Sequence, residues 1–344
     1  TPGDATLGIA YQYPLPARAE TPVGESGQVE GVLLLRGTVN VEGAIYARVG
    51  AEEVQLTALA SDAAGEVTIP AGISLDGMKY RVVAIGAQNE KGLFGSGAIA
   101  GMAQSITSVT LPSTLRTVWY GALALPTLTE IKVNGGASFK SISGVLYSGD
   151  GKLLVKYPFG MDASGRFDMP GHVQTVASGA FGYVGADGTV KAAHLSVISL
   201  GGALEYFGVR ERGYGYSHNA ETRKNTAQEL GLLVLLQSGV LTFSVPSGVQ
   251  KFVLAGDGEV LSKDETVLYL VRNRLQTDVT EYTIGADVTA IADYAFVTAP
   301  NLTSLSFAGT VEAFEALVEN SGSLWASGLK VTSVTCLDGT YTVR

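Results

Sequence analysis

The chain has 344 residues, of which 46% are hydrophobic and 16% are charged. This composition excludes a disordered chain and is enough for a large buried core. Its formal net charge is -9 and its sole cysteine is Cys336, so nucleic acid is excluded as an expected partner and an intramolecular disulfide is impossible.

The N-terminal part differs from the rest in composition. Residues 1–30 are rich in Pro, Gly and Glu without an apolar period, which predicts a flexible leader or linker. The sequence begins at Thr1 with no targeting segment, so any such segment is expected to have been removed. Residues 31–66 contain short apolar runs broken by glycine, such as Ile45-Tyr46-Ala47-Arg48-Val49, and predict a small β-cap. No apolar run reaches the roughly 20 residues of a membrane span.

Internal repeats dominate the remainder of the chain. One pattern opens at Leu111-Pro112, recurs at Met169-Pro170 and recurs again at Ile284-Gly285. Each copy continues with aliphatic residues at regular spacing and then with a small residue followed by a large apolar one. It ends in a strand of the form apolar-x-x-apolar-x-apolar. Partial copies raise the total to about six units. The residues expected to form the repeat core are Leu111, Leu115, Val118, Leu128, Ile131, Val173, Val176, Phe181, Ile284, Val288, Ile291, Phe296, Leu302 and Leu305.

These residues resemble the BspA-like leucine-rich repeats of bacterial surface proteins, whose units follow an I-P-x-x-V-x-x-I-G-x-x-A-F … L-x-x-I-x-I scheme. Residues 284–307 match that scheme well. The resemblance covers residues 67–343 and implies a mainly β solenoid of about six irregular repeats behind the N-terminal β-cap. It also implies export, since members of this family are typically exported and some are described as adhesins.

Two kinds of element interrupt the expected array. Hairpin insertions are expected near 134–160 and 208–231, and the Asp150-Gly151 pair in the first is itself a hairpin signal. Low helical content is expected, with residues 311–319 as the clearest helical stretch because Phe314, Leu317 and Val318 share one face.

Residues that could carry chemistry are few. The three histidines, His172, His194 and His218, have no metal-ligand spacing. No catalytic residue, metal site or cofactor is therefore predicted, and Asp-Gly pairs such as Asp150-Gly151 are attributed to turns instead of calcium loops.

The segment around residues 208–224 is the predicted contact surface because it alternates Tyr and Gly beside Arg. Its candidate binding residues are Arg210, Arg212, Tyr214, Tyr216 and His218. The outward face of the repeat strands is a second candidate, since solenoids tend to bind there. That face is expected to carry Thr129, Glu130, Lys132, Thr303, Ser304 and Ser306.

The sequence thus predicts a non-catalytic binding and scaffolding protein, extracellular or anchored at the cell surface. Its expected partners are host or neighbouring-cell surface proteins. Glycan binding is an alternative because exposed tyrosines also stack on sugars. An enzyme of unrecognised type is a further alternative, against which the lack of a clustered acid, base, metal or cofactor motif counts.

Overall fold

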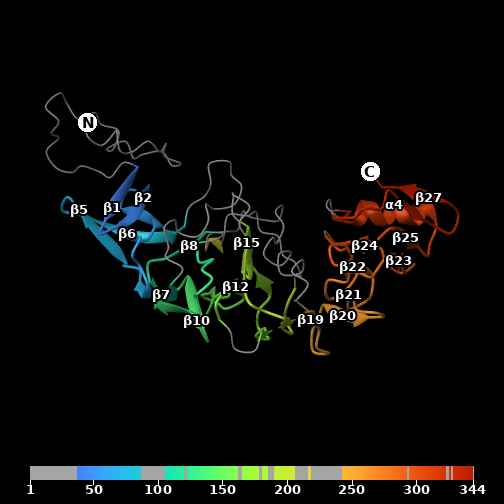
Figure 1. Cartoon of the computed structure of the whole chain (residues 1–344), viewed down its shortest axis with the longest axis horizontal. Coiled ribbons are helices and arrows are strands. Elements are labelled where there is room, and N and C mark those ends of the chain that lie inside the picture. The colour runs from blue at the N-terminus through green and yellow to red at the C-terminus, as the bar shows by residue number, and fades with distance from the viewer. Residues whose placement is uncertain are drawn as a thin grey trace, which may run out of the picture. The chain divides into compact units, whose positions relative to one another are not determined.

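The computed structural model of this chain describes residues 37–86, 105–119, 122–161, 165–177, 180–184, 190–205, 216–217, 242–292, 294–322, 325–326 and 328–343. Contacts divide the chain into two compact units, and each is described by itself (Figure 1). Unit 1 comprises residues 1–161, 177–193 and 209–231, and unit 2 comprises residues 162–176, 194–208 and 232–344.

The fold is mainly β, as the sequence predicts, and α4 (Val311–Asn320) is the single α-helix of the described residues. The described strands are grouped in seven separate sheets of two to seven strands. A continuous solenoid sheet is therefore not confirmed, because antiparallel hairpins interrupt the parallel pairing between repeats.

The largest sheet of unit 1 combines a meander with repeat strands. Its order is β1-β2-β3-β6-β8-β18, and β5 also pairs with β6. The strands are β1 (Thr38–Val41), β2 (Ala44–Gly50), β3 (Glu53–Ala58), β5 (Gly72–Leu75), β6 (Met78–Ile85), β8 (Thr117–Val118) and β18 (Tyr216–Ser217). Pairing is antiparallel along β1-β2-β3 and parallel along β3-β6-β8.

Three hairpins of unit 1 turn in two residues each, at Glu42-Gly43, Asp76-Gly77 and Ser143-Gly144. In each turn both residues have positive φ, between 50° and 84°. Such a pair gives a turn whose twist matches that of the flanking strands, and glycine adopts the second position without steric cost.

The remaining sheets of unit 1 are smaller. Strands β4 (Gly65–Thr68), β7 (Ile106–Pro112) and β9 (Glu130–Asn134) form a parallel ladder in that order. Strands β10 (Phe139–Ile142), β11 (Val145–Ser148) and β12 (Leu153–Lys156) form a meander within the insertion expected near 134–160. Strands β15 (Gly182–Val184) and β16 (Val190–Ala192) form a hairpin.

Unit 2 repeats the same combination of ladders and meanders. Strands β13 (Arg166–Asp168), β17 (Val197–Ser199) and β19 (Thr242–Ser244) form a parallel ladder. Strands β20 (Phe252–Ala255), β21 (Glu259–Ser262) and β22 (Val267–Leu270) form a meander, and β22 pairs in parallel with β24 (Ala290–Ile291). The unit also contains β14 (Thr175–Val176).

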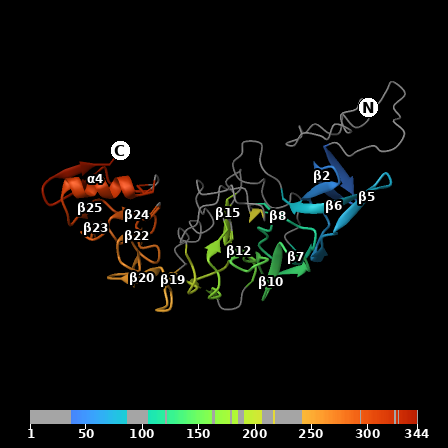
Figure 2. The ribbon, with the colours of Figure 1, turned by 180° about the vertical axis from the view of Figure 1, so that it is seen from behind.

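The C-terminal sheet of unit 2 is parallel along β23 (Glu281–Ile284), β25 (Ser304–Phe307) and β26 (Ser333–Thr335), and antiparallel between β26 and β27 (Thr340–Thr342). Helix α4 lies beside these strands in both views (Figures 1 and 2). It confirms the helix expected at 311–319, begins at the N-cap Thr310, and buries Phe314 and Leu317.

The core of each unit is built from the repeat residues. Each of the fourteen core positions named above is buried, with no more than 7% of its surface exposed. Ile131 belongs to the hydrophobic cluster of unit 1, and Leu305 belongs to that of unit 2 beside Phe314 and Trp325. The burial of these positions is the arrangement that a repeat core requires.

The two meanders close their second turn with the same hydrogen bonds. Ser148 donates its hydroxyl to Asp150 Oδ1 at 2.6 Å, and Ser262 does the same to Asp264 Oδ1 at 2.6 Å. The serine oxygen in turn accepts the backbone N–H of the next strand, from Leu153 or Val267. These hydrogen bonds to the carboxylate lower the pKa of Asp150 and of Asp264, mainly through the serine.

We expect these two aspartates to make folding acid-sensitive. Their pKa values are lowered from 3.8 by the fold, so their contribution to stability is present above that pH and is lost as pH falls through the folded-state values. NMR titration of the side-chain carboxyls measures this directly. Ser148→Ala should move the pKa of Asp150 back toward 3.8 and leave that of Asp264 unchanged. If the pKa of Asp150 is the same in that variant as in the wild type, then Ser148 is not the main cause of its lowering.

Candidate functional site

The structure describes little of the predicted binding segment. Arg210, Arg212, Tyr214 and His218 lie outside the described residues. Tyr216 begins the short strand β18, whose backbone pairs with β8 opposite Val118. Tyr216 is therefore the one candidate binding residue that the structure describes, and it belongs to the largest sheet of unit 1.

The outward faces of the parallel ladders are exposed only in part, since Ser108 of β7 and Ser199 of β17 are buried. Thr68, Thr110 and Lys132 form one row across β4-β7-β9, in which Thr68 is exposed and Thr110 and Lys132 are partly buried. The residues expected on this outward face, Thr129, Glu130, Lys132, Thr303, Ser304 and Ser306, are all exposed or half-exposed. Parallel sheets usually bury both faces, so a partly exposed polar face is unusual for this kind of sheet.

Two threonine pairs link neighbouring repeats with the same pair of hydrogen bonds. Thr129 donates both its backbone N–H, at 2.8 Å, and its hydroxyl, at 3.0 Å, to the carbonyl of Thr107. Thr303 donates the same two groups to Thr280 at 2.9 and 3.2 Å. The partners are 22 and 23 residues apart, which is the length of one leucine-rich repeat.

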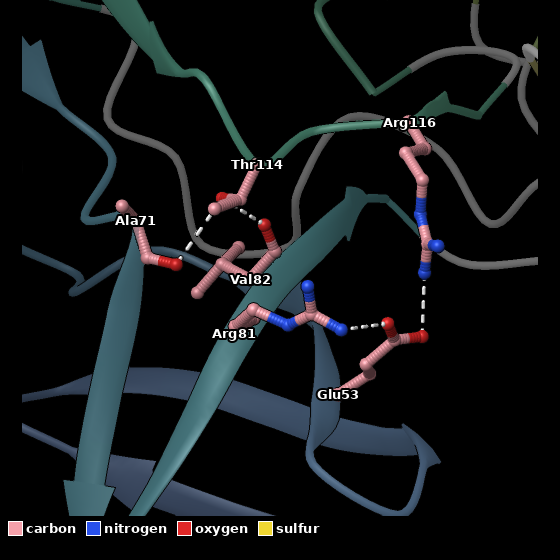
Figure 3. Close-up of polar contacts among 6 residues, drawn as sticks. All are labelled: Glu53, Ala71, Arg81, Val82, Thr114 and Arg116. Atoms are coloured by element: carbon pink, nitrogen blue, oxygen red, sulfur yellow. Dashed lines mark hydrogen bonds and ion pairs between the residues drawn. The ribbon is translucent and has the colours of Figure 1, made fainter. Parts of the chain in front are cut away.

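A charged cluster lies where β3, β6 and β8 run side by side (Figure 3). Glu53, the first residue of β3, stands opposite Arg81 of β6, and its Oε1 accepts from Arg81 Nη2 at 2.8 Å. Its Oε2 accepts from Arg116 Nη2, just before β8, at 2.5 Å. The carboxylate therefore bridges two guanidinium groups.

The two arginine side chains are more exposed than the glutamate side chain between them. The side chains of Arg81 and Arg116 are 62% and 44% exposed, whereas that of Glu53 is 21% exposed. The anion is thus the more enclosed partner, and the two cations keep more contact with solvent. One negative and two positive charges leave the cluster with a net positive charge.

Thr114 fixes the chain just before Arg116. Its hydroxyl oxygen lies 2.7 Å from the carbonyl oxygen of Val82 and 3.1 Å from that of Ala71, so the two acceptors share its single proton (Figure 3). This is the point where the edge of β6 changes partner from β5 to β8. Arg116 then continues the ladder by donating its N–H to Val83.

We expect Thr114→Val to lower the free energy of unfolding by about 1 kcal/mol, because two carbonyls lose a donor while the side-chain shape is kept. Urea unfolding at neutral pH measures the loss. Thr117→Val, three residues away and without a side-chain hydrogen bond among the described residues, is the matched control and should change little. Equal losses in both variants would contradict a specific role for Thr114.

A second polar cluster lies inside unit 2. The side chain of Arg272 is 9% exposed and pairs with Glu259, its Nη1 3.4 Å from Glu259 Oε1. Its Nε also donates to Gln276 Oε1 at 3.1 Å, and its guanidinium lies 5.7 Å from the ring centre of Tyr282. Burial and the charge of Glu259 raise the pKa of Tyr282, while Arg272 opposes the rise. The enclosure of Arg272 favours a structural role.

The described residues contain no group of three or more His, Cys, Asp or Glu side chains placed to hold a metal ion. His172 and His194 are exposed, and Cys336 is buried, with its thiol pKa raised by burial and by Asp338. In the same described part of the chain, no helix has the length and apolar character needed to cross a membrane.

No protein-family model and no curated protein matches the chain. The chain is similar to the pneumococcal vaccine antigen PcpA, with 13% identity, a TM-score of 0.29 and coverage of 81% of this chain and 83% of that one. It is also similar to a leucine-rich cell surface protein of Faecalibacterium prausnitzii, with 13% identity, a TM-score of 0.36 and coverage of 78% and 70%.

A leucine-rich-repeat protein of Eubacterium ventriosum is similar at 14% identity, with a TM-score of 0.36 and coverage of 80% of this chain and 69% of that one. Several of these similar structures are thus bacterial leucine-rich-repeat proteins, the class that the repeat pattern resembles.

Proposed function

We propose that this chain is a non-catalytic binding and scaffolding protein that acts outside the cell, either secreted or anchored at the cell surface. Its partners are proteins on host or neighbouring cells. The proposed division is a leader at 1–30, a β-cap at 31–66 and an irregular solenoid at 67–343. The observation that carries the proposal is the partly exposed polar face of the parallel ladders β4-β7-β9 and β23-β25-β26.

The chemistry of that face suits protein contact. Thr283, Ser306 and Thr335 are in register across β23, β25 and β26, and none of the three is buried. Neighbouring strands lie about 4.8 Å apart, so the hydroxyls form a regular row of donors and acceptors. Repeat proteins use such extended surfaces to bind other proteins.

A binding screen tests this function. The folded chain and a heat-unfolded control are immobilised and probed with extracellular-matrix proteins and with a glycan array. The expected result is saturable binding of a protein that the unfolded control does not bind. Binding of glycans alone would replace the proposed partner class, and a reproducible catalytic turnover would overturn the non-catalytic assignment.

Three double variants locate the contact. Thr283→Arg with Thr335→Arg places bulk on the polar face of unit 2, and we expect it to abolish binding if this face makes the contact. Ala313→Arg with Ala316→Arg adds the same charge at exposed positions of α4 and should leave binding intact. Tyr214→Ala with Tyr216→Ala tests the predicted loop in the same way.

A further inference from the structure

We propose that Arg81 and Arg116, held together by Glu53, recognise the carboxylates of an acidic segment in a protein partner. This inference rests on the proposed protein-binding function and names the chemistry of the partner. It is carried by the geometry of the cluster on β3, β6 and β8 (Figure 3).

The cluster presents unused hydrogen-bond donors. A guanidinium has five N–H donors in a rigid fork. Within the described residues, Arg81 and Arg116 each use Nη2 on Glu53 and make no other side-chain hydrogen bond. The remaining N–H groups of both guanidiniums can donate to a carboxylate in the bidentate arrangement that arginine favours.

Glu53 keeps the two cations in place without neutralising both. Its side chain is less exposed than that of either arginine, and each carboxylate oxygen holds one guanidinium. Two long side chains that would otherwise repel each other are thereby fixed side by side, so less conformational entropy is lost when a ligand binds.

The fold has little need of these ion pairs. Pairs in which the cation is largely exposed contribute little to stability, because water and salt screen them. The sheet is already held by the pairing of β3, β6 and β8 and by the buried side chains of Val54, Val82 and Val118. The arginine pair is therefore better explained by recognition than by folding.

The charge around the cluster favours a short acidic protein segment over a long polymer such as a nucleic acid or a sulfated glycan. Residues 37–86 and 105–119 together hold four basic and six acidic side chains, a net charge of -2, and the whole chain carries -9. Nucleic acids and sulfated glycans bind through broad basic fields, which this surface lacks. A few carboxylates can bind through short-range forked contacts within an acidic surrounding.

The position of the cluster also connects it with the predicted contact segment. Arg116 directly precedes β8, and β8 pairs with β18, the described part of the 208–231 insertion, through Val118 opposite Tyr216. A partner segment held at Arg116 would therefore lie on the same sheet as the strand that contains Tyr216.

The test measures binding of a fluorescent hexaglutamate peptide to the full chain by anisotropy. We expect saturable binding, weakened at least about tenfold in Arg81→Gln with Arg116→Gln, because charge-assisted hydrogen bonds are lost. Lys263→Gln with Lys330→Gln removes two exposed positive charges in unit 2 and should leave binding unchanged. Thermal unfolding of both double variants should match that of the wild type.

The conservative pair Arg81→Lys with Arg116→Lys keeps the charge and removes the fork, and we expect it to bind the peptide several-fold more weakly. The proposal is overturned if the wild type does not bind hexaglutamate, or if the two glutamine double variants lose affinity equally. Stronger binding of a heparin fragment than of the peptide at the same arginines would also overturn it, in favour of a sulfated glycan.

The outcomes separate this inference from the proposed function. A protein partner whose binding is unaffected by Arg81→Gln with Arg116→Gln would support the function and refute the arginine site. Peptide binding that depends on both arginines, with no protein bound in the screen, would support the site and leave the protein-binding function without support.

Discussion

Leu305→Asp is expected to lower the free energy of unfolding of unit 2 by more than about 4 kcal/mol, because it buries a charge without a partner and removes a packed side chain. Leu305 is 2% exposed in the centre of β25 and belongs to the cluster that contains Phe296, Phe314 and Trp325. The same reasoning applies to Ile131→Asp in unit 1, since Ile131 is fully buried on β9.

The two tryptophans allow each unit to be followed separately. Trp119 lies in the cluster of unit 1 and Trp325 in that of unit 2. Urea unfolding is therefore monitored by fluorescence in a Trp119→Phe background, where Trp325 alone reports. Ser304→Asp, an exposed neighbour on the same strand, is the matched control and should keep the wild-type midpoint. An unchanged midpoint in Leu305→Asp would refute the repeat core.

Arg272→Met is expected to be the next most damaging single change, with a loss of about 3 kcal/mol, since it leaves an acidic partner enclosed without its cation. Glu259 is 18% exposed, and Arg272 Nη1 lies 3.4 Å from its Oε1. Its Oε2 is already buried without a hydrogen bond. Denaturant midpoints of unit 2 measure the effect.

A double variant separates charge from packing. Glu259→Leu in the Arg272→Met background removes the stranded carboxylate, and we expect it to restore most of the lost stability. Arg274→Met, an exposed arginine two residues away, should change little. If the double variant is less stable than Arg272→Met alone, then the cluster acts through packing and the ion-pair explanation is wrong.

The repeat core could be read from the sequence because its signal is local and recurs. Val118, Ile131 and Leu305 occupy apolar positions whose spacing is the same in each copy of the repeat, and each is buried in the structure. The helix at 311–319 was predictable for the same reason, as its apolar residues keep a helical period.

Some hairpins other than the one at Asp150-Gly151 also have a turn signal in the sequence. Asp76-Gly77 gives the same turn signal as Asp150-Gly151 and joins β5 to β6. Glu42-Gly43 and Ser143-Gly144 are weaker signals, because the first residue of each is not typical of a turn with positive φ. The second meander, β20-β21-β22, is recognised from the structure. Its turn has the same hydrogen bond between Ser262 and Asp264 as the first meander has between Ser148 and Asp150.

The arginine cluster could not be predicted from the sequence. Glu53 is 28 residues from Arg81 and 63 residues from Arg116, and no local pattern links the three. They meet because β3, β6 and β8 pair in parallel at a particular register. That register depends on the packing of many buried residues, which one sequence does not specify by inspection.

The parallel ladders join strands that are separated by very different lengths of chain. Val109 pairs with Ile131, 22 positions later, whereas Phe167 pairs with Ile198 after 31 and Ile198 with Phe243 after 45. The strand positions are therefore independent of how long each connection is, since loop length adds only slowly to the entropy of closure. For protein engineering, a connection that holds neither a core residue nor a paired strand is the natural place to insert an epitope, a label or a second domain. The connection between β17 and β19 is not such a place, because it contains β18.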